Sequence, residues 1–188
     1  MRGVALLLLA AAAVAQPPPP DRSALVRRQR KVTIERFFRA VEQRDDLDAA
    51  TKEKILRLRP DATLGGELDC IHQALTLLSP EYKRADALLM YERYEAAAEA
   101  LRPLRESKDP YLRAYASYRY GLAQLNRERF EEAARAFTEV LNERRWPVGC
   151  NVDAAFYLAI AHGQAREKEK ALVAAERRAQ TVAGELAR

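Results

Sequence analysis

The sequence predicts an all-α protein, and three observations support that prediction. Hydrophobic residues make up 48% of the 188-residue chain, and Ala and Leu, which favour helices, dominate them. Only seven glycines and one tryptophan occur, which favours helix over sheet. Apolar residues recur at helical spacing from Ser23 almost to the C-terminus. The length suits one domain with a moderate core.

The segment before Ser23 predicts an export signal followed by a linker. Arg2 precedes a short apolar run, and Ala13, Val14 and Ala15 form the small-residue site typical of a secretory signal peptide, residues 1–15. A membrane-spanning helix needs about 20 apolar residues, whereas this run ends at four prolines that favour a stiff spacer over residues 16–22. We therefore expect cleavage near Ala15 and an exported protein, periplasmic or extracellular, without a transmembrane anchor.

Residues 23–78 predict an N-terminal helical extension of three helices. The first begins near Ser23 and carries an apolar stripe; the second begins at Asp46 as cap and ends at Pro60. The third helix follows the loop 61–66. The stripe of the first helix consists of Ile34, Phe37, Phe38 and Val41, and that of the third of Leu68, Ile71, Leu75 and Leu78. This extension is either a degenerate repeat with a cap or a separate addition.

Ser79 and Pro80 form a helix start signal, and an internal repeat comes after them. The repeated alanines Ala97, Ala133 and Ala171 recur at intervals of 133 − 97 = 36 and 171 − 133 = 38. Small residues stand 12 positions before each of them, because 97 − 85, 133 − 121 and 171 − 159 all equal 12: they are Ala85, Gly121 and Ala159. A period in the mid-thirties predicts a solenoid of helical hairpins.

The units of this repeat resemble the tetratricopeptide repeat (TPR). The second unit, residues 114–147, carries the signature at Tyr120, Gly121, Phe130, Ala133 and Phe137. The first unit, residues 78–111, resembles it at Ala85, Tyr94 and Ala97, and a weaker third unit, residues 152–185, at Ala159 and Ala171. Lys168 and Ala175 replace large apolar signature residues, as expected of a terminal repeat that faces water. The resemblance implies about three hairpins over residues 79–188, the first of them kinked at Pro103.

The resemblance also implies a partner-binding groove. In this family the first helix of each unit lines the concave face, and one place on it is aromatic in all three units: Tyr82, Tyr118 and Phe156. Neighbouring groove places hold Asp86, Leu89, Met90, Tyr115, Leu122, Leu125, Asn126 and Ile160. Aromatic anchors with few charges suit a peptide with apolar side chains. The alternative is that these rings pack against the adjacent repeat.

The sequence contains no recognisable catalytic, cofactor or metal motif. His72 and His162 lack ligand spacing, and Cys70 and Cys150 lack a CxxC pattern. Nucleophile, Walker and Rossmann motifs do not occur. The acidic pairs Asp45–Asp46 and Glu131–Glu132 are assigned to helix starts. We expect the cysteines, about two units apart, to remain unbonded, and we expect Gly121→Ala to be tolerated and Gly121→Leu not.

The charge pattern leaves two classes of function open. The net charge is +5, but 32 basic and 27 acidic residues are interleaved, which indicates solvated helix faces rather than a nucleic-acid surface. The exception is the cluster Arg27, Arg28, Arg30 and Lys31, which could contact an anionic envelope surface. The leading hypothesis is a non-enzymatic exported adaptor that binds a protein or peptide in its groove. The alternatives are an anionic-surface binder and a subunit or fragment of a larger TPR assembly.

Overall fold

The computed structural model describes residues 22–59, 67–142 and 148–186, and all regular structure there is helical. The helices are α1 (Arg22–Glu42), α2 (Ala49–Leu56), α3 (Glu67–Leu78), α4 (Pro80–Met90), α5 (Tyr94–Leu101), the 3₁₀ helix η1 (Pro103–Glu106), α6 (Pro110–Asn126), α7 (Phe130–Asn142) and α8 (Val148–Leu186). The all-α prediction is confirmed for this part of the chain. The expected signal peptide, residues 1–15, and the prolines after it lie outside the described residues.

Most predicted helix ends agree with the structure. Ser79 caps α4 by accepting a hydrogen bond from the Tyr82 amide, and Pro80 is the first helical residue. α5 ends at Leu101, and Pro103 begins the 3₁₀ helix, because proline cannot continue the hydrogen-bond ladder of an α-helix. The predicted cap at Asp46 is wrong. Asp48 caps α2 instead, and Asp46 pairs with Arg44 at 2.6 Å.

Two turns reverse the chain within the repeats. Glu92 and Glu128 adopt positive φ angles of 57° and 58°, and they stand at equivalent places, since 128 − 92 = 36. In each turn the next amide bonds back to the preceding helix: Arg93 N–H donates to Leu88 and Arg129 N–H to Gln124, both at 2.9 Å. α4 therefore packs on α5, and α6 on α7, as antiparallel neighbours.

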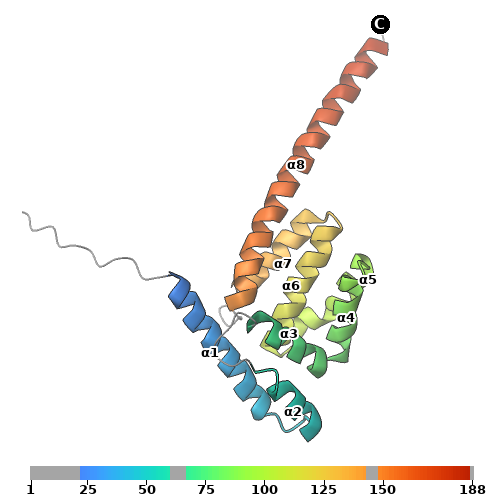
Figure 1. The fold of residues 1–188 in the computed structure, drawn as a ribbon. Helices are drawn as coiled ribbons and strands as arrows, with labels where there is room; N and C mark the ends of the chain where they lie inside the picture. The colour runs from blue at the N-terminus through green and yellow to red at the C-terminus, as the bar shows by residue number, and fades with distance from the viewer. Residues whose placement is uncertain (1–21, 60–66, 143–147, 187–188) are drawn as a thin grey trace, which may run out of the picture.

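The third unit does not form the expected hairpin. The equivalent turn residue would be Arg166, since 166 − 128 = 38, but α8 continues through it for 39 residues from Val148 to Leu186. Lys168 stands where Tyr94 and Phe130 come after the other turns, and Arg, Glu, Lys and Ala around it all favour helix. Figure 1 shows α8 extending away from the other helices. Ala159, expected at a close helix contact, is therefore exposed.

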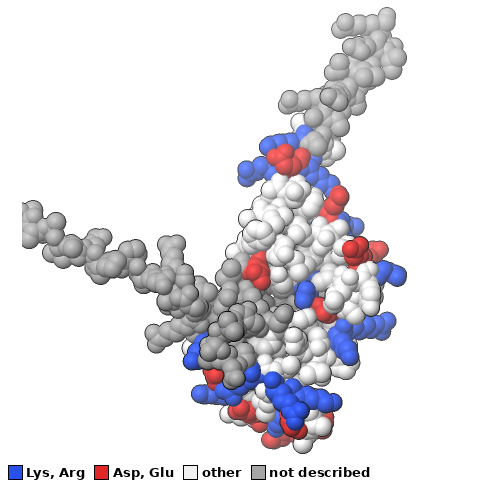
Figure 2. Space-filling view, in the orientation of Figure 1, with Lys and Arg blue, Asp and Glu red and all other residues white. Residues whose placement is uncertain are grey.

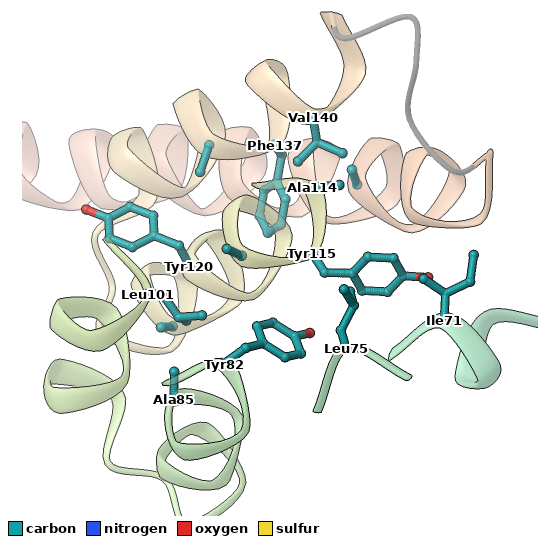
Figure 3. Close-up of a cluster of buried hydrophobic side chains, with 14 of the residues drawn as sticks. Ile71, Leu75, Tyr82, Ala85, Leu101, Ala114, Tyr115, Tyr120, Phe137 and Val140 are labelled. Carbon is teal, nitrogen blue, oxygen red and sulfur yellow. The ribbon is translucent and has the colours of Figure 1, made fainter. Parts of the chain in front are cut away.

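The N-terminal helices pack against the repeats. The predicted stripe of α1 is buried, and the Phe37 ring meets Tyr111 of α6 edge-on at 5.0 Å. α3 lies against α4, and both α1 and α3 contact α8 (Figure 1). In Figure 3, Tyr115 of α6 points towards Ile71 of α3, with Leu75 and Tyr82 beside them. The core thus runs from the extension into the repeats without a break.

This packing removes the argument that Cys70 and Cys150 are too far apart in the fold to form a disulfide. We expected Cys70 and Cys150 to lie two units apart along a row, but α3, which holds Cys70, contacts α8, which begins just before Cys150. Cys70 is buried, and the side chain of Cys150 lies outside the described residues. Whether they bond stays a prediction.

Candidate partner-binding surface

The predicted aromatic ladder is not a uniform exposed surface. Tyr82 is 0% exposed, Tyr118 is half-buried, and Phe156 is 62% exposed. Tyr118 packs on Phe137 and Tyr157, with ring centroids 6.1 and 6.2 Å away. The groove assignment is wrong for Tyr82, because a fully buried ring cannot contact a partner.

Three positions of the predicted groove are buried beside helix α3: Tyr82, Asp86 and Tyr115. His72 accepts or donates a hydrogen bond at Nδ1 with the Tyr82 hydroxyl, 2.9 Å away, and its ring stacks on Tyr115 at 6.3 Å. Tyr115 is buried as a result. For Tyr82 and Tyr115 the alternative interpretation holds: their rings pack inside the protein.

Asp86 belongs to a charged cluster beneath α3. Its carboxylate lies 3.2 Å from His72 Nε2 and 3.2 Å from Arg119 Nε. Burial alone would raise the pKa of Asp86, but the hydrogen bond with His72 and the charges of Arg119 and His72 together hold that pKa below its ordinary value. Asp86 therefore joins α3, α4 and α6 and is not available to a partner.

Sequence reasoning missed the roles of His72 and Arg119. His72 lies next to Ile71 on the apolar stripe of α3, and Arg119 lies next to Tyr118 on α6. Two features of the sequence pointed to these contacts. His72 stands beside the apolar stripe of α3, and Asp86 stands at a groove position that is apolar in the other two units. Their pairing depends on how α3 packs on the repeats, which no spacing along the chain specifies.

The rest of the predicted groove remains accessible. We call this surface the open strip: Leu89, Met90, Leu122, Leu125, Asn126, Phe156 and Ile160, all half-buried or exposed. It follows equivalent places on α4, α6 and α8, and α6 contacts both of the others. Met90 is 76% exposed and Phe156 62%. The strip presents mainly aliphatic and aromatic side chains to solvent.

The repeat signature residues lie mostly in the core. Ala85, Ala97, Ala133 and Phe137 are fully buried, Tyr120, Gly121 and Phe130 are buried, and Tyr94 is half-buried. The side chain of Ala171 lies outside the described residues. These positions therefore belong mainly to the interior of the first two units.

Charged side chains gather away from the centre of the face shown in Figure 2. They lie at the end of the molecule formed by α2, along the edge formed by α4 and α5, and on α8 where it leaves the other helices (Figures 1 and 2). In the basic cluster, Lys31 is exposed on α1, and the side chains of Arg27, Arg28 and Arg30 lie outside the described residues. No described helix is long and apolar enough to span a bilayer.

No cluster of potential metal ligands occurs within the described ranges. No three His, Cys, Asp or Glu side chains gather there as ligands for a metal ion. The chain matches no protein-family model, and neither a curated protein nor a solved structure matches it.

Proposed function

We propose that this protein is a non-enzymatic, TPR-like scaffold of the exported kind that binds a protein or peptide partner along the open strip. The observation that carries the proposal is the unequal burial of equivalent places. Tyr82, Asp86 and Tyr115 are buried beside α3. Leu122, Leu125, Phe156 and Ile160, at other positions of the same predicted groove, stay accessible.

The chemistry of the strip favours an apolar ligand. Its side chains are hydrophobic apart from Asn126, whose Nδ2 already donates to the Leu122 carbonyl at 2.9 Å. Apolar anchors in a shallow groove typically bind one face of a helix or an extended segment. A terminal carboxylate would need basic or amide donors, and the strip offers few. The partner we propose is a segment with apolar side chains spaced to meet α4, α6 and α8.

Site-specific photo-crosslinking tests the strip. A photoreactive amino acid at Leu125 or Phe156 should capture a partner in cells, whereas the same probe at the exposed control Val32 on α1 should not. Leu125→Arg should then weaken capture from position 156 by at least about tenfold, which corresponds to more than about 1 kcal/mol. Because Leu125 also packs against the core, capture is compared at a temperature at which both proteins are folded. Equal capture at Val32, or capture unaffected by Leu125→Arg, would show that the strip is not the binding surface.

The same assay separates this proposal from an anionic-surface binder. Reversing the charges of Arg27, Arg28, Arg30 and Lys31 should leave capture at Leu125 intact. If these residues instead attach the protein to an anionic envelope, the reversal removes it from the envelope fraction. Sequencing the N-terminus of the mature protein tests export, and the expected first residue is Gln16.

A further inference from the structure

The first half of α8 packs as the first helix of a repeat. In the second unit, Ala116, Tyr120 and Ala123 share one face of α6, and all three are buried. Their equivalents in the third unit are Ala154, Leu158 and Ala161 on α8, which packs on α7, and both alanines are fully buried. This half of the third unit is therefore in register with the second.

The adjacent face of α8 lacks a helix equivalent to the one that covers this face in α6. In the second unit, Ser117, Gly121 and Gln124 are buried, and the return helix α7 places the Phe137 ring directly on Gly121. The equivalents in the third unit are Ala155, Ala159 and His162, and all three are exposed, because α8 continues straight instead of returning.

A groove marks the place of the missing helix. The α7–α8 groove has a volume of about 440 Å³ and is lined by residues of both helices, among them Phe130, Ala134, Thr138, His162 and Ala165. Its apolar floor comes from Phe130 and Ala134 of α7 and from Ala165 of α8. A second helix of the third unit would lie here if the hairpin closed.

The chain contains a helix with the repeat pattern expected in this groove, but within one copy that helix cannot reach the groove. Residues 167–186 carry the second-helix pattern, with Ala171 in the column of Ala97 and Ala133. They are helical and continuous with the first half of α8. A straight helix rises about 1.5 Å per residue away from its own start. The second half of an unbroken α8 therefore cannot pack on the first half of the same copy.

Lys168 supports the straight form of α8. Its ammonium lies 5.5 Å from the centre of the Phe130 ring and 3.7 Å from a Glu128 carboxylate oxygen. These contacts join α8 to the turn before α7. Lys168 stands at the repeat position that Tyr94 and Phe130 occupy directly after the turns of the other two units. Lys168 thus makes surface contacts with α7 and the turn before it at the point where the hairpin would otherwise reverse.

We propose that a second copy of this chain fills the α7–α8 groove. Two α8 helices lie antiparallel, and the second half of each packs between α7 and α8 of the other, which gives a closed two-fold dimer. The Gly121–Phe137 contact has a spacing of 137 − 121 = 16. By the same spacing, the proposed dimer pairs Ala159 of one copy with Ala175 of the other, where Ala175 replaces the large apolar residue of the second unit. The two-fold axis then passes near residue 167, the midpoint of 159 and 175.

Light scattering coupled to size exclusion tests the dimer on the full chain. The wild type should form a dimer that dissociates on dilution, and Ala159→Arg should raise the dissociation constant at least tenfold. Ala50→Arg, at an exposed alanine of α2, is the matched control and should leave the dimer unchanged. Leu125→Arg should also leave it unchanged, so that failure of the dimer and failure of partner binding at the open strip are distinguishable.

A photoreactive residue at position 159 identifies the helix that covers the face. With a mixture of tagged and untagged copies, the expected product joins two copies and maps close to position 175. A product within one chain would show a closed hairpin and overturn the proposal. A monomer at all concentrations, or a dimer that survives Ala159→Arg with the helix content unchanged, would overturn it as well.

Discussion

At the scale of single residues, Gly121 shows how the absence of a Cβ atom allows two helices to pack closely. A Cβ built on Gly121 would lie 2.6 Å from a Phe137 ring carbon. The Phe137 ring is fully buried and has Tyr118 and Tyr157 beside it, so it has little room to move. The sequence predicted a close approach here, and that is confirmed. The same contact argues against the expected tolerance of alanine, because an added methyl group requires the Phe137 ring to shift.

Gly121→Ala should therefore lower stability despite its better helix propensity. Overpacking costs about 1 to 3 kcal/mol, against a gain of about 1 kcal/mol from replacing glycine in a helix. Gly163→Ala in α8 is the matched control, since nothing lies within 4 Å of its added Cβ, and it should be neutral or stabilising. Denaturant unfolding measures both. If Phe137→Leu does not reduce the cost of Gly121→Ala, the clash with that ring is not the cause.

Asp86 should make stability depend on pH. Its pKa is lowered in the folded protein, so its contribution is present above the ordinary carboxyl pKa of about 3.9 and is lost as the pH falls through the lower folded value. Asp86→Asn should cost about 1.5 to 3 kcal/mol at pH 7, and this difference from wild type should shrink below about pH 4. Asp45→Asn, at an exposed residue, should show no such trend. A constant difference down to pH 3 would contradict the assignment.

At the scale of elements, the repeats show what positions that recur along the sequence can and cannot predict. The cap at Ser79 and the α1 stripe depend on local chemistry, and both were predicted correctly. At Pro103 a kink was expected, whereas in the structure α5 ends at Leu101 and a 3₁₀ helix begins at Pro103. The turn at Arg166 was predicted from periodicity alone. Glu92 and Glu128 are no better turn formers than Arg166, so the difference lies in the residues two places further on. Tyr94 and Phe130 pack after their turns, whereas Lys168 is exposed.

Hydrogen exchange should divide α8 into two parts when the groove is empty. In the Ala159→Arg monomer, amides of Ala154–Ala161 should stay protected, because that stretch packs against α7. Amides beyond residue 172 should exchange faster, since an isolated helix of this length is only marginally stable in water. Mass spectrometry of the two segments measures the difference. Equal protection along the whole of α8 in this variant would contradict the division.

At the scale of the whole molecule, the N-terminal extension decides which surface remains for a partner. Its three helices were predicted from their stripes, but a stripe does not state what it packs on. His72 of α3 contacts both Tyr82 and Tyr115, and these two predicted groove residues are therefore part of the core. The residues of the open strip could therefore be predicted from positions that recur with the repeat. Which of the predicted groove residues are buried instead depends on how α3 packs, and this could not be predicted from the sequence.

This packing predicts that the extension and the repeats unfold together. Leu75 of α3 is 1% exposed, and Leu75→Ala should cost about 2 to 5 kcal/mol. The neighbouring Leu77 is 42% exposed, and Leu77→Ala should stay within about 0.5 kcal/mol of wild type.

Thermal unfolding followed by circular dichroism should show one transition for both variants, shifted down only in Leu75→Ala. Each kcal/mol should lower the midpoint by about 2 to 4 °C in a chain of this size. Hydrogen exchange of Ala133–Val140 in α7 supplies a probe distant in sequence from the substitution. If α3 is part of one cooperative core, Leu75→Ala lowers protection of those α7 amides as much as it lowers global stability. An early separate transition, with α7 protected as in the wild type, would show that the extension unfolds independently and that the repeats hold together without it.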